Sequence, residues 1–160
     1  MQALQRLPLK QISVNIATTN GAAYALGEQI GVAVKITDAS LDSGVPIYIK
    51  GVSLINKTSQ ATPIQCMFFN ALPTVASADK APVNIADAEL VAKFVGGIEV
   101  VAGDWNLLAN NAICTKVVGA GIVVAPLAKS KDIWLLLMAK AAFTFGSVQD
   151  LVVKLDIEQG

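Results

Sequence analysis

The chain has 160 residues, enough for one domain with a single core, and 54% of them are hydrophobic while only 15% are charged. A soluble protein typically carries about 25% charged residues, so the surface of this one is poor in charge. The formal net charge is zero and the charges are scattered, which excludes the basic patch that binding to a nucleic-acid backbone requires.

Strand periodicity dominates the first seventy residues. Apolar and polar residues alternate within Leu7–Ile16 and most clearly within Gln29–Thr37, the period of a half-buried strand. Val45–Asn56 resumes the alternation with β-branched and aromatic residues, and Ile64–Asn70 is a further short strand. We expect the last two segments to form a hairpin.

The middle of the chain interrupts this pattern. Leu72–Pro82 contains prolines together with small and polar residues, which predicts a long excursion without regular structure. Asn84–Phe94 follows, and there Asp87 could cap one or two helical turns through Leu90 and Val91. The sequence therefore predicts a single short helical segment.

Strand patterns resume after the helix, at Val95–Val101, Ile113–Val118, Gly121–Ala125, Ile133–Lys140 and Val148–Glu158. About eight to ten strands without alternating helices favour an antiparallel β-sandwich over a parallel α/β fold. We predict one all-β, jelly-roll-like domain over residues 1–160. Residues 1–10 are either an N-terminal arm that adds a strand to a neighbouring subunit or an ordinary first strand with a frayed start.

The apolar stretches are too short to form a membrane-spanning helix. The longest are Val117–Ala128, which glycines and a proline interrupt, and Ile133–Ala139, whereas a spanning helix needs about 20 residues. Arg6 is followed by Pro8 and Lys10 rather than by the apolar stretch of a secretory signal. We expect a protein that is made in a cytoplasm and has no membrane partner.

The sequence lacks the residues that most catalytic sites use. It contains no histidine, which removes the Ser-His-Asp and Cys-His mechanisms and the usual zinc sites. Asp156 and Glu158 share a strand face with Lys154, which is typical of a solvated face rather than of paired catalytic carboxylates. Asp38 and Asp42 lie in a loop that could bind calcium, but their spacing matches no EF-hand pattern, and turn formation explains both residues equally well. We predict a protein that is not an enzyme and that has no cofactor or metal.

Two cysteines, Cys66 and Cys114, lie on different predicted strands and lack CxxC spacing. This arrangement favours two buried free thiols, with a disulfide as the alternative.

The aromatic residues leave two interpretations open. Trp134 lies in a run that is apolar on both faces, which predicts burial in the core or at an interface. Trp105 follows a turn, where it is either a loop anchor or an exposed contact. Together with Tyr24 and Tyr48, the tryptophans keep a carbohydrate-binding module as an alternative function.

Several segments resemble, in their order along the chain and in their pattern of residue types, a group of small tailed-bacteriophage virion proteins described as structural, decoration or head-associated proteins. The resemblance extends from residue 24 to the C-terminal strand and includes no catalytic signature. The segments that carry it are Tyr24–Val34, Ile49–Leu54, Ile64–Asn70, Ile85–Gly97 and Leu151–Ile157.

The resemblance implies a β-sandwich subunit on a phage particle, most often a decoration or cement protein on the capsid exterior. The low charge agrees, because a cementing subunit buries apolar surface against its neighbours. The expected partners are the major capsid protein or other virion subunits, and further copies of this chain in a trimer or dimer. A neck, tail or head-fibre base component is the alternative within the virion. The candidate contact residues are Leu4, Arg6, Leu7, Trp105 and Trp134.

Overall fold

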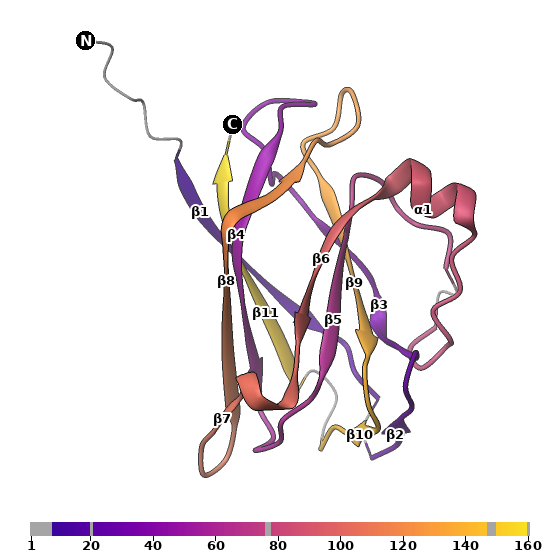
Figure 1. Cartoon of the computed structure of the whole chain (residues 1–160), viewed down its shortest axis with the longest axis vertical. Coiled ribbons are helices and arrows are strands. Elements are labelled where there is room, and N and C mark those ends of the chain that lie inside the picture. The colour runs from indigo at the N-terminus through magenta and orange to yellow at the C-terminus, as the bar shows by residue number, and fades with distance from the viewer. Residues whose placement is uncertain (1–7, 20, 76–77, 147–149, 160) are drawn as a thin grey trace.

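The computed structural model describes residues 8–19, 21–75, 78–146 and 150–159, and nearly all of the regular secondary structure within them is β-strand (Figure 1). A short helix, α1 (Asp87–Lys93), and a 3₁₀ turn, η1 (Ala102–Asp104), interrupt the strands. Three strands have two residues each: β2 (Ala23–Tyr24), β7 (Asn106–Leu107) and β10 (Phe143–Thr144). The eight longer strands are β1 (Leu9–Ile16), β3 (Gln29–Ile36), β4 (Ile47–Asn56), β5 (Ile64–Phe69), β6 (Phe94–Val100), β8 (Ala112–Val124), β9 (Ile133–Ala139) and β11 (Leu151–Gln159).

The long strands form two antiparallel sheets that pack face to face. The first sheet has the order β1-β11-β4-β8-β7 and the second the order β3-β9-β5-β6. Among the eight long strands the first pairs with the last, the second with the seventh, the third with the sixth and the fourth with the fifth. This is the pairing of one long hairpin wound into two sheets, the double Greek key of a jelly roll. The predicted fold class is confirmed.

Alternating side chains build the core between the sheets. On β11, Leu151, Val153, Leu155 and Ile157 are fully buried, whereas the lysine and acidic residues between them face outward. A one-residue slip of this strand would turn every apolar side chain to solvent, so the pattern fixes its register. Its pairing with β1 runs over eight residues without a register shift.

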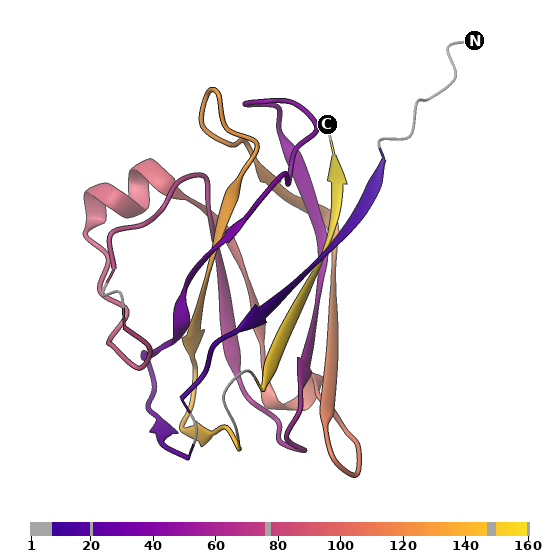
Figure 2. The same ribbon diagram turned by 180° about the vertical axis from the view of Figure 1, so that it is seen from behind.

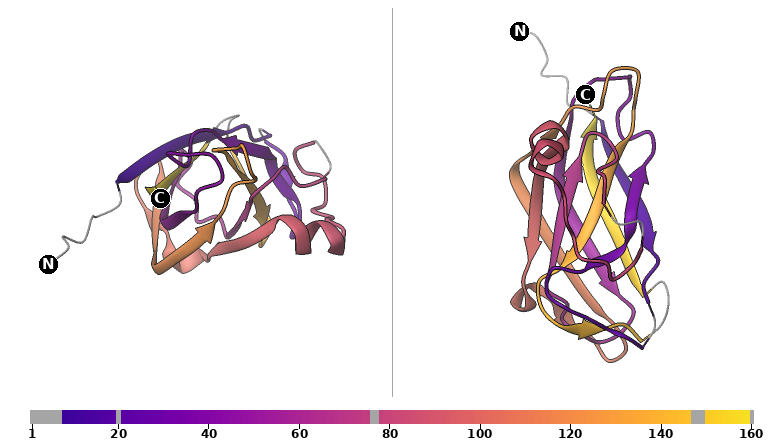
Figure 3. Two further views of the ribbon diagram at one scale, coloured as in Figure 1. Left: turned by 90° about the horizontal axis from the view of Figure 1, so that it is seen from above. Right: turned by 90° about the vertical axis from the view of Figure 1, so that its right-hand side faces the viewer.

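The second sheet is covered on its outer face as well. In β9, Leu135 and Leu137 belong to the core, yet Leu136, which points to the opposite side, is also fully buried. Phe69 on β5 is buried in the same layer and contacts the ring of Phe94 edge to face at 5.6 Å. Figure 3 (right) shows the excursion between β5 and α1 in front of this sheet. The apolar character of both faces of β9 therefore reflects a third layer.

The carboxylate of Asp79 helps to attach this excursion to the sandwich. Asp79 accepts hydrogen bonds from the Tyr24 hydroxyl at 2.6 Å, from the Gly31 amide at 2.6 Å and from the Thr19 hydroxyl. Backbone bonds between Gln29 and residues 80–81 continue the attachment along the edge of β3. Residues 79–81 of the long excursion predicted from prolines and small residues are thus attached to the sandwich.

Three sequence-based expectations are wrong in detail. β4 and β5 do not form a hairpin, because residues 57–63 carry the chain from one sheet to the other. Asp87 does not cap the helix, since Ala86 occupies the N-cap position and no side chain caps it. The segments predicted as two strands within residues 113–125 are one strand, β8, which Gly121 bends with a φ of 83°.

Candidate protein-contact surfaces

Three of the five candidate contact residues lie outside the described residues. Leu4, Arg6 and Leu7 precede Pro8, where the description of the chain begins. Their role as contacts, and the N-terminal arm to which they belong, stay predictions.

Trp105 is a loop anchor. Its side chain is only 7% exposed and belongs to the core, directly after η1. Its indole N–H donates a hydrogen bond of 3.0 Å to the carbonyl of Thr62, in the loop that joins β4 and β5. A tryptophan that is buried and hydrogen-bonded within its own chain is unavailable to a partner or a sugar ring. Of the two interpretations that the sequence left open, the structure supports the anchor and argues against Trp105 as a contact residue.

Trp134 is half-buried on the outer face of the second sheet. It pairs with Lys35 of β3 on one side and with Phe69 of β5 on the other. The Lys35 ammonium forms an ion pair of 2.6 Å with Asp132. The hydrogen bond from Lys35 lowers the pKa of the Asp132 carboxyl. Trp134 therefore combines an accessible ring surface with a fixed position.

The outer face of the first sheet carries exposed apolar side chains that sequence reasoning missed. Ile113, Val117 and Val123 point away from the core along β8, and Val117 is 80% exposed. We refer to these three residues as the β8 strip. Half-buried Ile55 and Tyr48 lie beside Ile113 and Val123 on the neighbouring strand β4. Exposed apolar side chains are typical of contact surfaces when they form one contiguous patch, whereas singly scattered ones are ordinary.

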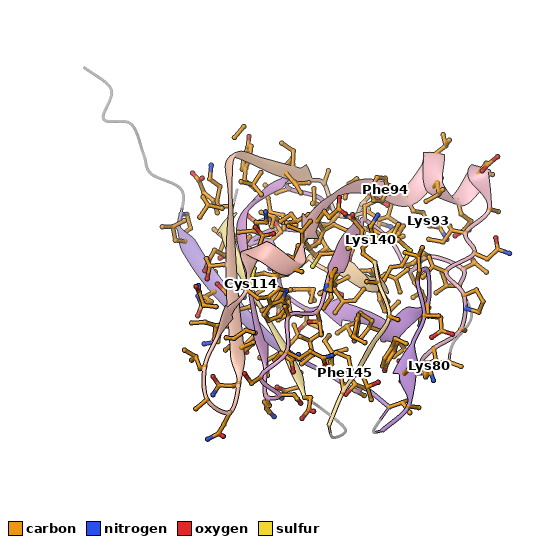
Figure 4. All side chains as sticks on the ribbon, turned by 60° about the horizontal axis from the view of Figure 1, so that its bottom comes forward. Lys80, Lys93, Phe94, Cys114, Lys140 and Phe145 are labelled. Atoms are coloured by element: carbon orange, nitrogen blue, oxygen red, sulfur yellow. The ribbon has the colours of Figure 1, made fainter. Side chains whose placement is uncertain are left out.

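A second apolar surface lies around α1, on the opposite side of the sandwich. No residue of this helix is buried, Val91 is 89% exposed, and Leu72 and Phe94 are exposed nearby. We refer to Leu72, Val91 and Phe94 as the α1 platform. Figure 4 labels Lys93, the last residue of the helix, and Phe94, which follows it. The two apolar surfaces face away from each other.

Two charged residues hold the α1 platform in place. The Glu89 carboxylate accepts hydrogen bonds from the Lys93 ammonium at 2.8 Å and from the Thr74 amide at 2.9 Å. Lys93 in turn donates to the carbonyl of Leu72 at 2.9 Å. The hydrogen bond from Lys93 is the main cause that lowers the pKa of Glu89. The platform is therefore ordered without being buried.

Burial keeps the cysteine thiols of the core in their unreactive, protonated form. Both cysteines are free and buried, and burial raises the pKa of the Cys66 thiol to about 12.

Within the described residues, no histidine, cysteine, aspartate or glutamate side chains gather in a group of three that could hold a metal ion. None of the helices in this part of the chain is long and apolar enough to cross a membrane.

No protein-family model matches the chain, and no curated protein matches it. Among solved structures it is similar to one titled "Structure of infectious bursal disease virus Gx strain", with a TM-score of 0.33 and 10% sequence identity. The match covers 97% of this chain and 37% of that chain. At this score the likeness carries no argument about function, and the jelly-roll fold stands on the strand order itself.

Proposed function

We propose that this chain is a non-catalytic structural protein of a tailed-bacteriophage virion, and specifically a capsid decoration protein. It forms oligomers and binds the head lattice on the capsid exterior, with the major capsid protein as its partner. The observation that carries the proposal is the pair of exposed apolar surfaces, the β8 strip and the α1 platform, on opposite sides of a sandwich with few charges.

This arrangement suits a subunit that works by contact. Burial of apolar surface contributes roughly 25 cal/mol per Å², so aliphatic side chains are the natural source of affinity for a lattice. Two surfaces on opposite sides allow one subunit to touch two neighbours at once, which is how a cement stabilises a shell. The resemblance to phage virion proteins supports the same function independently of the surfaces.

The test begins with particles from cells infected by the phage that encodes the chain. We expect the chain to band with full heads in a density gradient, and cryo-electron microscopy to show its density on or between the capsomers. Density confined to the neck, tail or head fibres would replace the decoration assignment with the alternative within the virion. Absence of the chain from the particles would overturn the virion proposal.

A substitution on the β8 strip tests the contact surface directly. Val117 is 80% exposed, so Val117→Lys should fold normally and yet bind purified heads lacking the protein at least tenfold more weakly. Ser43→Lys, which introduces the same lysine at an exposed loop position, is the matched control and should bind as the unaltered chain does. Equal binding of both variants would exclude the β8 strip as the lattice contact.

A further inference from the structure

The first strand of the sandwich has a free edge. β1 pairs with β11 on one side and is the last strand of its sheet, with no other strand of the described residues bonded to its second side. In Figure 2, β1 runs diagonally across the front of the molecule with no other ribbon drawn before it. Its backbone groups on that side therefore lack a strand partner within the described chain.

The pairing with β11 identifies which backbone groups point to the free edge. The Gln159 amide donates to the carbonyl of Pro8 at 2.9 Å, so Pro8 and Gln159 are a hydrogen-bonded pair. Such pairs alternate along an antiparallel ladder. Even-numbered residues of β1 thus bond to β11, and the odd-numbered ones direct both N–H and C=O outward. These residues are Leu9, Gln11, Ser13 and Asn15.

The end of this free stretch is set by β3. A side chain added at Gly31 would come within 2.9 Å of the carbonyl oxygen of Ala17, the next odd-numbered residue. The edge beside Ala17 is therefore already occupied by the backbone of β3. Residues 9–15 are the part of the edge that a further strand can reach.

β1 carries few of the usual protections of an edge strand, namely Pro8 just before it and the inward-facing Lys10 near its start. Natural edges are protected by bulges, by charged side chains or by very short strands. β1 is eight residues long and its register with β11 has no shift. Lys10 is its only charged residue, and the ammonium donates to the carbonyl of Asp38 at 2.7 Å instead of standing over the edge. The free edge of β1 is therefore open to pairing with a further strand.

We propose that the free edge of β1 pairs antiparallel with β1 of a second copy of this chain, around a two-fold axis at Ile12. In this register Leu9 is bonded to Asn15 of the other copy, and Gln11 to Ser13. All four outward-directed residues of each strand gain partners. The two five-stranded sheets join into one continuous sheet.

The side chains favour a second copy in this register. Ile12 is half-buried at the margin of the core, and the two-fold axis places it against Ile12 of the other copy, which covers both. On the outer face the Gln11 side-chain N–H donates to Asp156 of its own chain at 2.8 Å, which leaves its carbonyl oxygen to accept from the Ser13 hydroxyl of the other copy. A shift by one residue would oppose outward-directed backbone groups to inward-directed ones. A shift by two in one direction would carry Leu9 toward Ala17, where β3 already lies, and a shift by two in the other direction would leave Asn15 without a partner among residues 9–15. The zero net charge adds no repulsion between copies.

This inference deepens the oligomeric part of the proposed function, and it is tested on the isolated chain. Failure to dimerise in solution would overturn the β1 pairing and leave the test on particles unaffected. Loss of the virion assignment would equally leave a dimer in solution intact.

The first experiment is sedimentation equilibrium of the full chain over a concentration series. We expect the mass to rise from that of the 16.7 kDa monomer toward twice that value. Ser13→Pro removes an N–H that faces the free edge and no bond to β11, so the variant should fold and stay monomeric. Ser13→Thr keeps the N–H and should dimerise. A monomeric unaltered chain, or a dimeric Ser13→Pro variant, would overturn the proposal.

The second experiment fixes the register by crosslinking. Ile12→Cys places two thiols across the axis, where the Cα atoms of a non-hydrogen-bonded pair lie about 4.5 Å apart, and should form an intermolecular disulfide with copper-phenanthroline as the oxidant. Val14→Cys is the matched control, because its two copies lie about 13 Å apart along the strands. The native thiols are buried, so the unaltered chain should not crosslink. Crosslinking through Val14→Cys alone would contradict the proposed axis.

Discussion

The Tyr24 hydroxyl donates a hydrogen bond to the Asp79 carboxylate at 2.6 Å and thereby ties the long excursion to the sandwich. The Tyr24 ring is fully buried and contacts Phe143 and Phe145, with ring centroids 5.4 and 5.5 Å away. The same carboxylate binds the amide of Gly31 at the bulge of β3. One acidic side chain therefore joins the excursion, a buried aromatic cluster and a sheet edge.

We expect Asp79→Ala to destabilise the fold by about 3 kcal/mol. Hydrogen bonds to a charged group contribute roughly 1.5–3 kcal/mol each, and the Gly31 amide would lose its acceptor. Asp79→Asn keeps one acceptor oxygen and should cost about half as much. The measurement is the free energy of unfolding in urea.

The control for this prediction is Asp42→Ala, at an exposed aspartate in the loop before β4. It should change the free energy of unfolding by less than about 0.5 kcal/mol. Equal losses for the Asp79 and Asp42 variants would show that the cluster does not hold the excursion.

Substitutions at Trp105 distinguish an anchor from a contact residue. Trp105→Phe removes the bond to Thr62 and should lower the free energy of unfolding by about 1 kcal/mol. Trp105→Ala leaves a cavity and should lower it by about 3–5 kcal/mol. In a Trp134→Phe background the fluorescence of Trp105 should resist quenching by acrylamide. Unchanged stability of Trp105→Ala would contradict the anchor.

Alkaline pH should destabilise the fold through its buried acids. Burial raises the pKa of Cys66 from 9.0 to about 12, and burial followed by the bond to Asp79 raises the pKa of Tyr24. Between pH 9 and about 12 the unfolded chain releases the Cys66 proton while the folded chain keeps it. Because the unfolded state then binds fewer protons, stability falls as the pH rises.

The measurement is the free energy of unfolding in urea between pH 8 and 11. Cys66→Ala should be less stable at neutral pH by about 1 kcal/mol, yet its stability should fall less steeply above pH 9. Tyr24→Phe should flatten the curve further at the highest pH. Identical slopes in all three proteins would show that these groups do not control the alkaline transition.

The sequence predicts this fold well where one face of a strand is core and the other is solvent. β11 meets that condition, and its alternation identifies both the strand and its buried face. The alternation also identifies β3 as a strand, but a bulge between Ile30 and Val34 exposes Val32, so the buried face of β3 does not follow the pattern. The local sequence does not show which sheet a strand joins. The loop 57–63 could have the same composition whether it closed a hairpin or crossed between the sheets. β2, β7 and β10 have two residues each, too few to show a period.

The surfaces could be predicted only in part, for a physical reason that β8 illustrates. Along this strand Cys114 and Lys116 share the inward face, while Ile113 and Val117 point outward. Hydrophobicity alone would favour the reverse. Lys116 is stabilised at its position by an ion pair with Asp104, which a 3₁₀ turn supplies from another part of the chain. Partners that distant in the sequence leave no local pattern.

The ion pair between Lys116 and Asp104 yields a prediction for acidic pH. The Lys116 ammonium lies 2.8 Å from the Asp104 carboxylate, and that contact, with the Val101 amide, lowers the pKa of Asp104 below its ordinary 3.8. A lowered pKa stabilises the folded chain above pH 3.8, and the contribution disappears as the pH falls through the folded value. We therefore expect Lys116→Gln to be less stable than the unaltered chain at pH 6 and to match it near pH 2. Lys154→Gln, on the outer face of β11, is the control and should show no such convergence; a deficit in Lys116→Gln that persists at pH 2 would mean that the lysine acts through packing rather than charge.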